Sequence, residues 1–223
     1  DGERWETVQL GRAGQMFSLT PWGDLMTVGT SYLLETKPDG KPFRQSHTQF
    51  SSDGVRWTFS YHSPETLDKI FYTVRWCNDI AYSVAYGLSA QNGTLYRSPD
   101  ARNWEVVKAD FFPKGRGGNE GDLIFDDDGT AYCLLRGPYE TPVTIGVSKD
   151  PEYKEWEWHV PEVDWLGDGE TQSADDAIQA PFGGPKWIRL ADGRLIAYGR
   201  VLGPDTTERT TVAENTPTAG GDK

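Results

Sequence analysis

Apolar residues in this chain come in short bursts, and within each burst they alternate with polar residues at a period of two. The bursts are bounded by glycine, proline, aspartate and asparagine, which are typical of turns. Four of the clearest are Gln15–Val28, Tyr72–Tyr86, Asp122–Leu135 and Trp187–Tyr198. Because helical periodicity is almost absent, the pattern predicts an all-β chain built from antiparallel hairpins.

Tight turns are predicted inside several of these bursts. Asp128-Gly129 and Asp192-Gly193 each stand between two strand-length runs, which favours a hairpin. Gly23-Asp24 occupies a similar place earlier in the chain. A turn at the same place in successive segments already suggests that one structural unit is repeated.

A second repeat is in phase with these turns. Ser51–Trp57 (SSDGVRW) recurs as Ser98–Trp104 (SPDARNW), with a looser copy at Ser148–Trp156 and a partial one at Asp1–Trp5. The anchoring aspartates stand at 1, 53, 100 and 150, at spacings of 52, 47 and 50 residues. A unit of about fifty residues with several strands has the size of a β-propeller blade, which is a four-stranded antiparallel sheet.

The Ser-x-Asp-x-x-x-Trp unit has a structural explanation. Its aspartate can accept hydrogen bonds from the backbone of its own turn. Its tryptophan can bury a large apolar area between neighbouring sheets. We therefore expect Trp57, Trp104 and Trp156 to be buried near the junctions between blades.

These motifs resemble the Asp-box (BNR) repeats of the sialidase superfamily, and the resemblance extends over essentially the whole chain. The phrases Gly118-Asn119-Glu120, Cys133–Arg136 and Gly183–Leu195, followed by Arg200, are similar to those of a bacterial sialidase-like group. The resemblance implies a six-bladed β-propeller of sialidase type. It also favours a secreted or periplasmic location.

Counting blades along residues 1–223 gives one propeller domain that is incomplete by this resemblance. Residues 1–5 would close one blade, and residues 15–57, 70–104, 118–156 and 183–212 would supply four more. Most of the first blade and nearly all of the last would then be missing. This count favours a fragment over a smaller closed propeller, and it predicts exposed apolar edges at both ends.

Composition narrows the functional classes. The 28 aromatic residues among Trp, Tyr and Phe exclude a disordered chain. The net charge of −12 argues against binding to nucleic acid or to an anionic membrane surface, and no apolar run approaches 18 residues. Cys77 and Cys133 are expected to be small buried residues or one optional disulfide. No metal or cofactor is expected, because His47, His62 and His159 are far apart and form no spaced cluster.

Glu120 and Arg136 are the first candidates for a ligand site. Glu120 stands just before one predicted strand, and Arg136 ends the paired strand 16 residues later. A hairpin of that length returns the chain to the same end of the blade, so the two side chains can meet near the axis. Arg200 ends the corresponding hairpin of the next blade. An ordinary loop carboxylate and surface ion pairs remain the alternative interpretation of these three residues.

The resemblance implies roles for these residues. Related enzymes bind the substrate carboxylate with arginines, whose guanidinium groups suit bidentate hydrogen bonds. They use a tyrosine nucleophile with a glutamate as its base, and an aspartate as acid/base. Glu120 matches the glutamate, while Arg136 and Arg200 match two arginines. The tyrosine would fall after Lys223.

Arg75 is a third candidate for binding substrate, with an open alternative. Its strand resembles a family strand that carries arginine two residues earlier, where this chain has Thr73. Residues two apart share a strand face, so Arg75 could replace that arginine. It could equally be a cation stacked on Trp76 or Tyr72. Asp79 is a poor candidate for the catalytic acid. Its place in the turn Asn78-Asp79 is explained more simply by the preference of these residue types for turns.

Two functions remain open after this reading. One is an exo-α-sialidase-like glycoside hydrolase that cleaves a terminal acidic sugar from glycans. The other is a non-catalytic propeller that binds a glycan or a protein. The stretch Arg12–Met16 favours the second, because it lacks the carboxylate that the related group has there.

Overall fold

The computed structural model describes residues 14–87, 92–114, 118–136, 143–161, 182–202 and 208–212. Within these ranges nearly all regular structure is β-strand, and the helix found there is one 3₁₀ turn, η1 (Pro64–Thr66). The strands form four antiparallel sheets in chain order, named A to D here. The prediction of an all-β chain is confirmed.

Each sheet is a meander in which the strands follow one another in sequence order. Sheet A contains β1 (Gly14–Leu19), β2 (Leu25–Thr36) and β3 (Pro42–Ser51). Sheet B contains β4 (Ile70–Phe71), β5 (Arg75–Cys77), β6 (Ile80–Tyr86), β7 (Thr94–Ser98) and β8 (Glu105–Lys108). Sheet C contains β9 (Gly121–Phe125), β10 (Ala131–Leu135), β11 (Thr144–Ser148) and β12 (Glu157–His159). Sheet D contains β13 (Phe182–Arg189), β14 (Leu195–Leu202) and β15 (Glu208–Val212).

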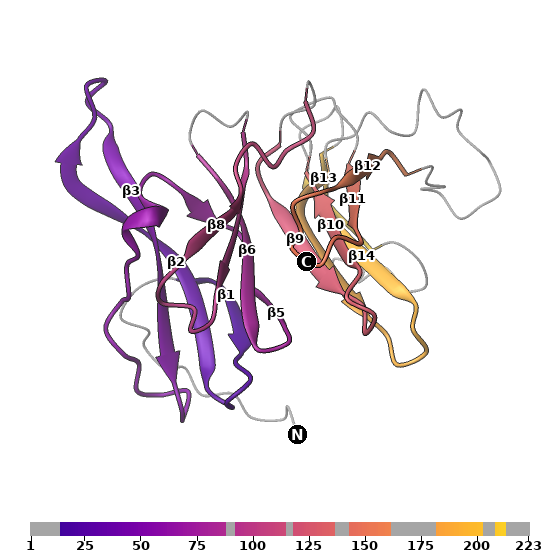
Figure 1. The fold of residues 1–223 in the computed structure, drawn as a ribbon. Helices are drawn as coiled ribbons and strands as arrows, with labels where there is room; N and C mark the ends of the chain where they lie inside the picture. The colour runs from indigo at the N-terminus through magenta and orange to yellow at the C-terminus, as the bar shows by residue number, and fades with distance from the viewer. Residues whose placement is uncertain are drawn as a thin grey trace, which may run out of the picture.

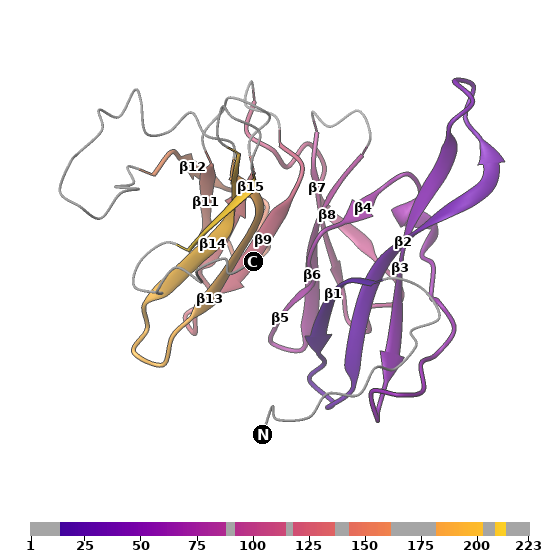
Figure 2. The same cartoon turned by 180° about the vertical axis from the view of Figure 1, so that it is seen from behind.

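The four sheets stand side by side as blades, each packed on the next (Figure 1). Sheets A and B meet at β2, β3 and β4, sheets B and C at β5, β6 and β9, and sheets C and D at β9, β10 and β13. The view from behind shows the same order (Figure 2). The first strand of a sheet thus takes part in each junction, as in a β-propeller, where the first strands line the axis.

Three apolar clusters fill the spaces between the blades. One joins sheets A and B and includes Phe50, Phe71 and Trp104. The second joins sheets B and C around Leu95 and Phe111, and a smaller one joins C and D. The core of the molecule is therefore divided among the junctions, each of which holds one blade to the next.

The number of strands agrees with the prediction only in part. Sheet C has the expected four strands. Sheet B contains five, but β4 and β5 both pair with the same edge of β6 and together take the place of one first strand. Sheets A and D have three strands among the described residues. An isolated bridge between Thr48 and Tyr61 lies where sheet A would have its fourth strand.

The same five-residue turn closes the first hairpin of three blades. In each, the first residue donates its N–H to the carbonyl of the fifth at 2.8 Å, as between Asp126 and Thr130. The fourth residue is a glycine with positive φ: 93° at Gly23, 85° at Gly129 and 87° at Gly193. Because side chains strain that conformation, glycine is required there. The hairpins predicted at these three positions are confirmed.

The three Asp-box turns within the described residues have the predicted hydrogen bonds. Asp53 accepts the backbone N–H groups of Val55 and Arg56 at 2.8 and 2.7 Å. Asp100 and Asp150 accept equivalent bonds in sheets B and C. The copy at residues 1–5 lies outside the described residues.

The tryptophans of these turns are buried to different degrees. Trp104 is 5% exposed and packs edge-on against Phe71 with ring centroids 4.7 Å apart, at the junction of sheets A and B. Trp156 and Trp57 are half-buried. Trp156 packs edge-on against Phe111 at the junction of sheets B and C, and Trp57 lies beside Phe17 in sheet A. The prediction of a tryptophan buried at a junction is confirmed for Trp104, whereas Trp57 and Trp156 are only half-buried.

Replacing Asp100 with alanine is expected to lower the free energy of unfolding at pH 7 by about 1–2 kcal/mol, as loss of a helix cap does. Burial opposes ionisation of this carboxyl, but the hydrogen bonds from Asn103 and Arg102 outweigh it and lower the pKa of Asp100. The stabilisation is therefore present above the unfolded pKa of about 4 and is lost as the pH falls through the folded value. Urea unfolding at pH 7 and pH 3 measures both effects.

The matched control is Asp127→Ala, because this aspartate is exposed in the β9–β10 turn. It should change the unfolding free energy by less than about 0.5 kcal/mol. An equal cost for the two variants would contradict a specific role of the Asp-box carboxylate.

The structure also places the cysteines and histidines of the sequence analysis. Cys77 and Cys133 are both free, Cys133 buried and Cys77 half-buried, so of the two alternatives the optional disulfide is the one that is not formed. His47 and His62 are close together, with ring centroids 5.4 Å apart, and Ser31 Oγ lies 3.0 Å from His47 Nδ1. The pairing of β2 with β3 and the return of the chain beside β3 bring these residues together, which their sequence spacing does not reveal.

Exposed apolar side chains are frequent on the two outermost sheets. Phe17, Leu19 and Trp22 are about half exposed or more in the first hairpin of sheet A, and Ile188 and Tyr198 are exposed by 45% and 39% in sheet D. Sheets B and C are each covered on both sides by a neighbouring sheet. No helix within the described residues is long and apolar enough to cross a membrane.

Candidate functional site

The start of β9, the first strand of sheet C, carries two carboxylates that face the neighbouring blades. Glu120 and Asp122 flank Gly121, so they project from the same face of the extended chain. Gly121 lies so close to sheet B that a Cβ there would be 3.0 Å from Val84 Cγ1. The absence of a side chain at this position lets β9 approach sheet B and brings both carboxylates to the place where sheets B, C and D meet.

Glu120 and Arg136 form the ion pair that their hairpin spacing suggested. Arg136 Nη1 donates to Glu120 Oε2 at 2.9 Å, and the backbone of Arg136 donates to the carbonyl of Glu120 at the same distance. The two side chains are 11% and 16% exposed. Oε2 of Glu120 also accepts the backbone N–H of Gly184 from sheet D at 2.8 Å. This carboxylate therefore joins two blades and retains some contact with solvent.

The backbone of Arg200 lies next to this ion pair. Arg200 is paired with Gly183 in the register of β13 and β14, and Gly184 is the residue that bonds to Glu120. The side chain of Arg200 lies outside what the structure describes. Its position on the strand is therefore at the expected end of sheet D, and its part in the site stays a prediction.

Arg75 is held by a partner that the sequence had not indicated. Its Nε and Nη2 donate to the two carboxylate oxygens of Asp122 at 2.8 and 2.6 Å, and Nη2 also reaches the carbonyl of Trp187 at 3.2 Å. Burial alone would lower the pKa of Arg75, but the bonds and charge of Asp122 outweigh it and raise that pKa. Binding of a substrate by Arg75 stays a prediction, since this bidentate bond already occupies much of its guanidinium group.

Asp122 fastens three blades at one point. It is fully buried, and besides Arg75 from sheet B it accepts the backbone N–H of Trp187 from sheet D at 3.0 Å. The indole N–H of Trp187 donates to the carbonyl of Asp122 at 3.2 Å. A carboxylate that is fully buried and bonded in this way holds the site together, whereas the side chain of Glu120 keeps 16% of its surface exposed.

Lys186 brings a third cation to the same place. Its ammonium nitrogen is buried, has no hydrogen-bond partner among the described residues and lies 3.7 Å from the centroid of the Tyr72 ring. Burial lowers the pKa of Lys186 to about 8, and the charges of Asp122, Arg75 and Glu120 act on it with smaller effects. Arg75, Arg136 and Lys186 outnumber the two carboxylates, so the site favours an anion although the whole chain is acidic.

Tyr86, at the end of β6, is close enough to the Glu120–Arg136 pair for both charges to act on its hydroxyl. Burial raises the pKa of Tyr86, the negative charge of Glu120 raises it further, and Arg136 opposes both. The hydroxyl therefore stays neutral near pH 7 and can donate or accept a hydrogen bond. The arrangement as a whole can bind a carboxylate through its cations and sugar hydroxyls through Glu120 and Tyr86.

The sequence interpretation missed Asp122, Lys186 and Tyr86. Asp122 could have been found, because it is the charged residue in the apolar strand GDLIF and shares the face of Glu120. Lys186 stands in the same manner between the apolar residues Pro185 and Trp187 of β13. Tyr86 had no local signal, since it is one of several aromatic residues in alternating strands. Asn78 and Asp79, with φ of 46° and 63°, form the turn between β5 and β6, which confirms Asp79 as a turn residue.

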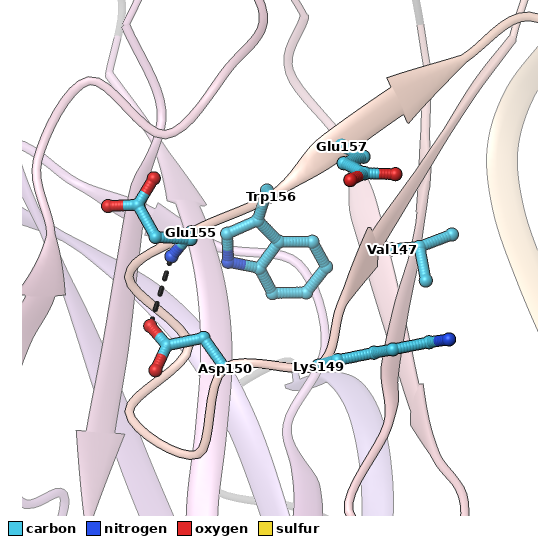
Figure 3. A pocket seen from close by; sticks show the side chains of 6 residues that line it. All are labelled: Val147, Lys149, Asp150, Glu155, Trp156 and Glu157. Atoms are coloured by element: carbon cyan, nitrogen blue, oxygen red, sulfur yellow. Dashed lines mark hydrogen bonds between the residues drawn. The ribbon is translucent and has the colours of Figure 1, made fainter.

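A separate hollow of about 390 Å³ lies on the outer part of sheet C, away from this cluster. Figure 3 shows Trp156 at its centre beside the Asp-box turn, in which Glu155 donates its backbone N–H to Asp150 at 3.1 Å. The lining residues are Val147, Lys149, Asp150, Glu155, Trp156 and Glu157. Its carboxylate Asp150 is bonded to its own turn, so this hollow is a consequence of the repeat and not the site of the convergent charges. Within the described residues there is no group of three His, Cys, Asp or Glu that could hold a metal ion.

Comparison with known proteins relates the chain to others through structure. No protein-family model and no curated protein sequence matches it. A solved protein of unknown function from Dyadobacter fermentans matches with a TM-score of 0.62 and 15% identity, over 92% of this chain and 64% of that one. A GH43 β-1,3-galactosidase matches with a TM-score of 0.53 and 10% identity, over 92% of this chain and 49% of that one. The GH32 β-fructofuranosidase of Bombyx mori matches with a TM-score of 0.51 and 21% identity, over 79% and 40%.

This chain thus spans less than two thirds of the length of each of these proteins. At such low identity the likeness concerns the fold. Sialidases are not among these three structures, whereas glycoside hydrolases with propeller folds are. The chain therefore has the β-propeller fold that is shared by glycoside hydrolases of families 43 and 32.

Proposed function

We propose that this chain carries the ligand site of a sialidase-like glycoside hydrolase that acts on a terminal acidic sugar of glycans. The observation that carries the proposal is the Glu120–Arg136 ion pair, which is partly exposed where three blades meet. Arg136 would bind the substrate carboxylate, together with Arg200 from the next blade. Glu120 would act as the base that draws a proton from the nucleophile.

The charge of the site supports an acidic sugar over a neutral one. Three cations face two carboxylates, and both carboxylates are already bonded to arginine. An incoming carboxylate would supply the negative charge that balances this excess, through charge-assisted hydrogen bonds. The propeller glycosidases with a similar fold support a glycan as the ligand class.

Binding without hydrolysis is a second candidate function, and one observation favours it. Oε2 of Glu120 accepts two hydrogen bonds, one from Arg136 and one from Gly184. Both bonds go to one oxygen of the carboxylate and occupy its two acceptor positions, so that oxygen is not open to a proton from a nucleophile. The site could then hold an acidic sugar without activating a nucleophile.

The test of the proposed function measures both hydrolysis and binding, each with an acidic sugar and with neutral sugars. Release of the chromophore from an aryl α-sialoside is measured beside an aryl β-galactoside and sucrose, and calorimetry measures binding of N-acetylneuraminic acid and galactose. Cleavage of the sialoside supports the enzyme. Binding of the acid without cleavage supports the second candidate. Cleavage of a neutral substrate, or no preference for the acidic sugar, overturns the proposal of an acidic ligand.

A further inference from the structure

The ammonium group of Lys186 is the feature of the site that the functions above leave unexplained. Its Nζ atom has almost no exposed surface and no hydrogen-bond partner in the part of the chain that the structure describes, although the residue as a whole is only half-buried. An ammonium group has three donors, and burying them without acceptors is costly. Such an arrangement is retained in a structure more readily where another molecule supplies the acceptors.

The surroundings of this group specify what kind of acceptor is missing. The two nearby carboxylates, Asp122 and Glu120, are bonded to Arg75 and Arg136 instead. The Tyr72 ring, 3.7 Å away, offers the ammonium only its electron-rich face. A ligand oxygen that carries negative charge would satisfy the donors and balance the third cation of the site.

We infer that Lys186 is a further ligand-binding residue, whose ammonium group donates hydrogen bonds to the carboxylate of the acidic sugar. The inference rests on the proposed function for the nature of that ligand. Lys186 stands in β13 two residues after Gly184, whose backbone N–H bonds to Glu120, and the charges of Glu120, Asp122 and Arg75 are close enough to act on its ammonium group. Its four rotatable bonds allow the ammonium to turn from the Tyr72 ring toward a ligand beside Glu120 and Arg136.

The affinity of the site for the acidic sugar should then decrease as the pH rises above 7. Burial lowers the pKa of Lys186 to about 8, so the group loses its proton as the pH rises from 7 to 9. The carboxylate ligand binds the protonated form, and its affinity should fall over this range. The other groups that act on or face Lys186 are Asp122, Glu120, Arg75, Tyr72 and Tyr198. Carboxyl, guanidinium and phenol groups ordinarily titrate outside this range.

The experiment compares wild type with Lys186→Met and Lys186→Arg by calorimetry, using N-acetylneuraminic acid and its methyl ester as ligands. The ester keeps the shape of the sugar and lacks the negative charge. Lys186→Met should weaken binding of the acid about ten- to a hundred-fold, the value of one charge-assisted hydrogen bond. It should change binding of the ester much less, and Lys186→Arg should retain most of the affinity.

Two further measurements keep the result interpretable. Lys186→Met removes a buried ammonium group that has no hydrogen-bond partner among the described residues, and methionine can still pack on the Tyr72 ring, so the melting temperature should not fall below that of wild type. Wild-type affinity for the acid should decrease from pH 7 to pH 9, while that of Lys186→Met should stay flat. Lys149→Met, a change at an exposed lysine of the outer hollow, is the control and should behave as wild type.

The outcomes separate this inference from the proposed function. If wild type binds the acid better than the ester and Lys186→Met preserves that difference, the role of Lys186 is overturned and the acidic-sugar site remains. If wild type binds neither ligand, both proposals fail together. A loss of preference for the acid that is confined to Lys186→Met supports the inference.

Discussion

Replacing Asp122 with alanine is expected to lower the free energy of unfolding by about 3–5 kcal/mol, the cost of removing one partner from a buried ion pair. The carboxylate is fully buried and accepts two bonds from Arg75 and one from the backbone of Trp187. The variant leaves a guanidinium without its counter-charge and a buried N–H without an acceptor. Since small proteins are stable by only about 5–15 kcal/mol, chemical denaturation should show a large shift in midpoint.

The matched control is the ion pair between Arg189 and Asp126. It too joins two neighbouring sheets, here C and D, but its side chains are 35% and 29% exposed. Asp126→Ala should therefore cost no more than about 1 kcal/mol. Similar losses for the two variants would show that burial does not strengthen the Asp122 pair.

A double variant separates the value of the pair from the cost of breaking it. Arg75→Met together with Asp122→Leu removes both charges and keeps side chains of similar volume, so it should recover much of the stability that either single change loses. If the double variant loses the sum of the two single losses, the two side chains do not interact through their charges.

Replacing Arg136 with alanine is expected to weaken binding of N-acetylneuraminic acid about ten- to a hundred-fold, which corresponds to about 1.5–3 kcal/mol. The change removes the cation proposed to meet the substrate carboxylate. It also leaves Glu120 with one bond fewer, and the freed negative charge repels the ligand. Calorimetry measures the loss, and in an active enzyme it would appear in kcat/KM.

Arg189→Ala serves as the control, because this arginine lies on sheet D and pairs with Asp126 in the turn of the neighbouring hairpin, not with Glu120. It should bind the ligand as wild type does. Equal loss in both variants would point to the general charge of the protein and would remove the argument for a site at Arg136.

Glu120→Gln is expected to separate catalysis from binding. The amide keeps an oxygen that can accept the bonds of Arg136 and Gly184, so binding should change little. It cannot take a proton, so turnover of the aryl sialoside should fall by about a hundred-fold or more if Glu120 is the base. Unchanged turnover would exclude this role.

The local parts of the structure could be predicted from the sequence. The turn at Gly129, the Asp-box bonds of Asp100 and the meeting of Glu120 with Arg136 all depend on residues within 16 positions of one another. Turn geometry and hairpin register determine such contacts, and both are set by neighbouring residues. Repetition at a spacing of about fifty residues then predicted the blades and their propeller arrangement.

The partners of the remaining charges depended on how the blades pack. Arg75 bonds to Asp122 across 47 positions, and Asp122 to Trp187 across 65, each time between different sheets. No local rule relates those positions, because they meet only when the twist and spacing of whole sheets bring their first strands together. The sequence alone therefore determined the blade, its turns and the pair of Glu120 with Arg136. The tertiary structure decided that Arg75 is held by a buried aspartate and that the ammonium group of Lys186 lies on the Tyr72 ring with no hydrogen-bond partner in the described part of the chain. Burial and charge pairing depend on surfaces that exist only between folded blades.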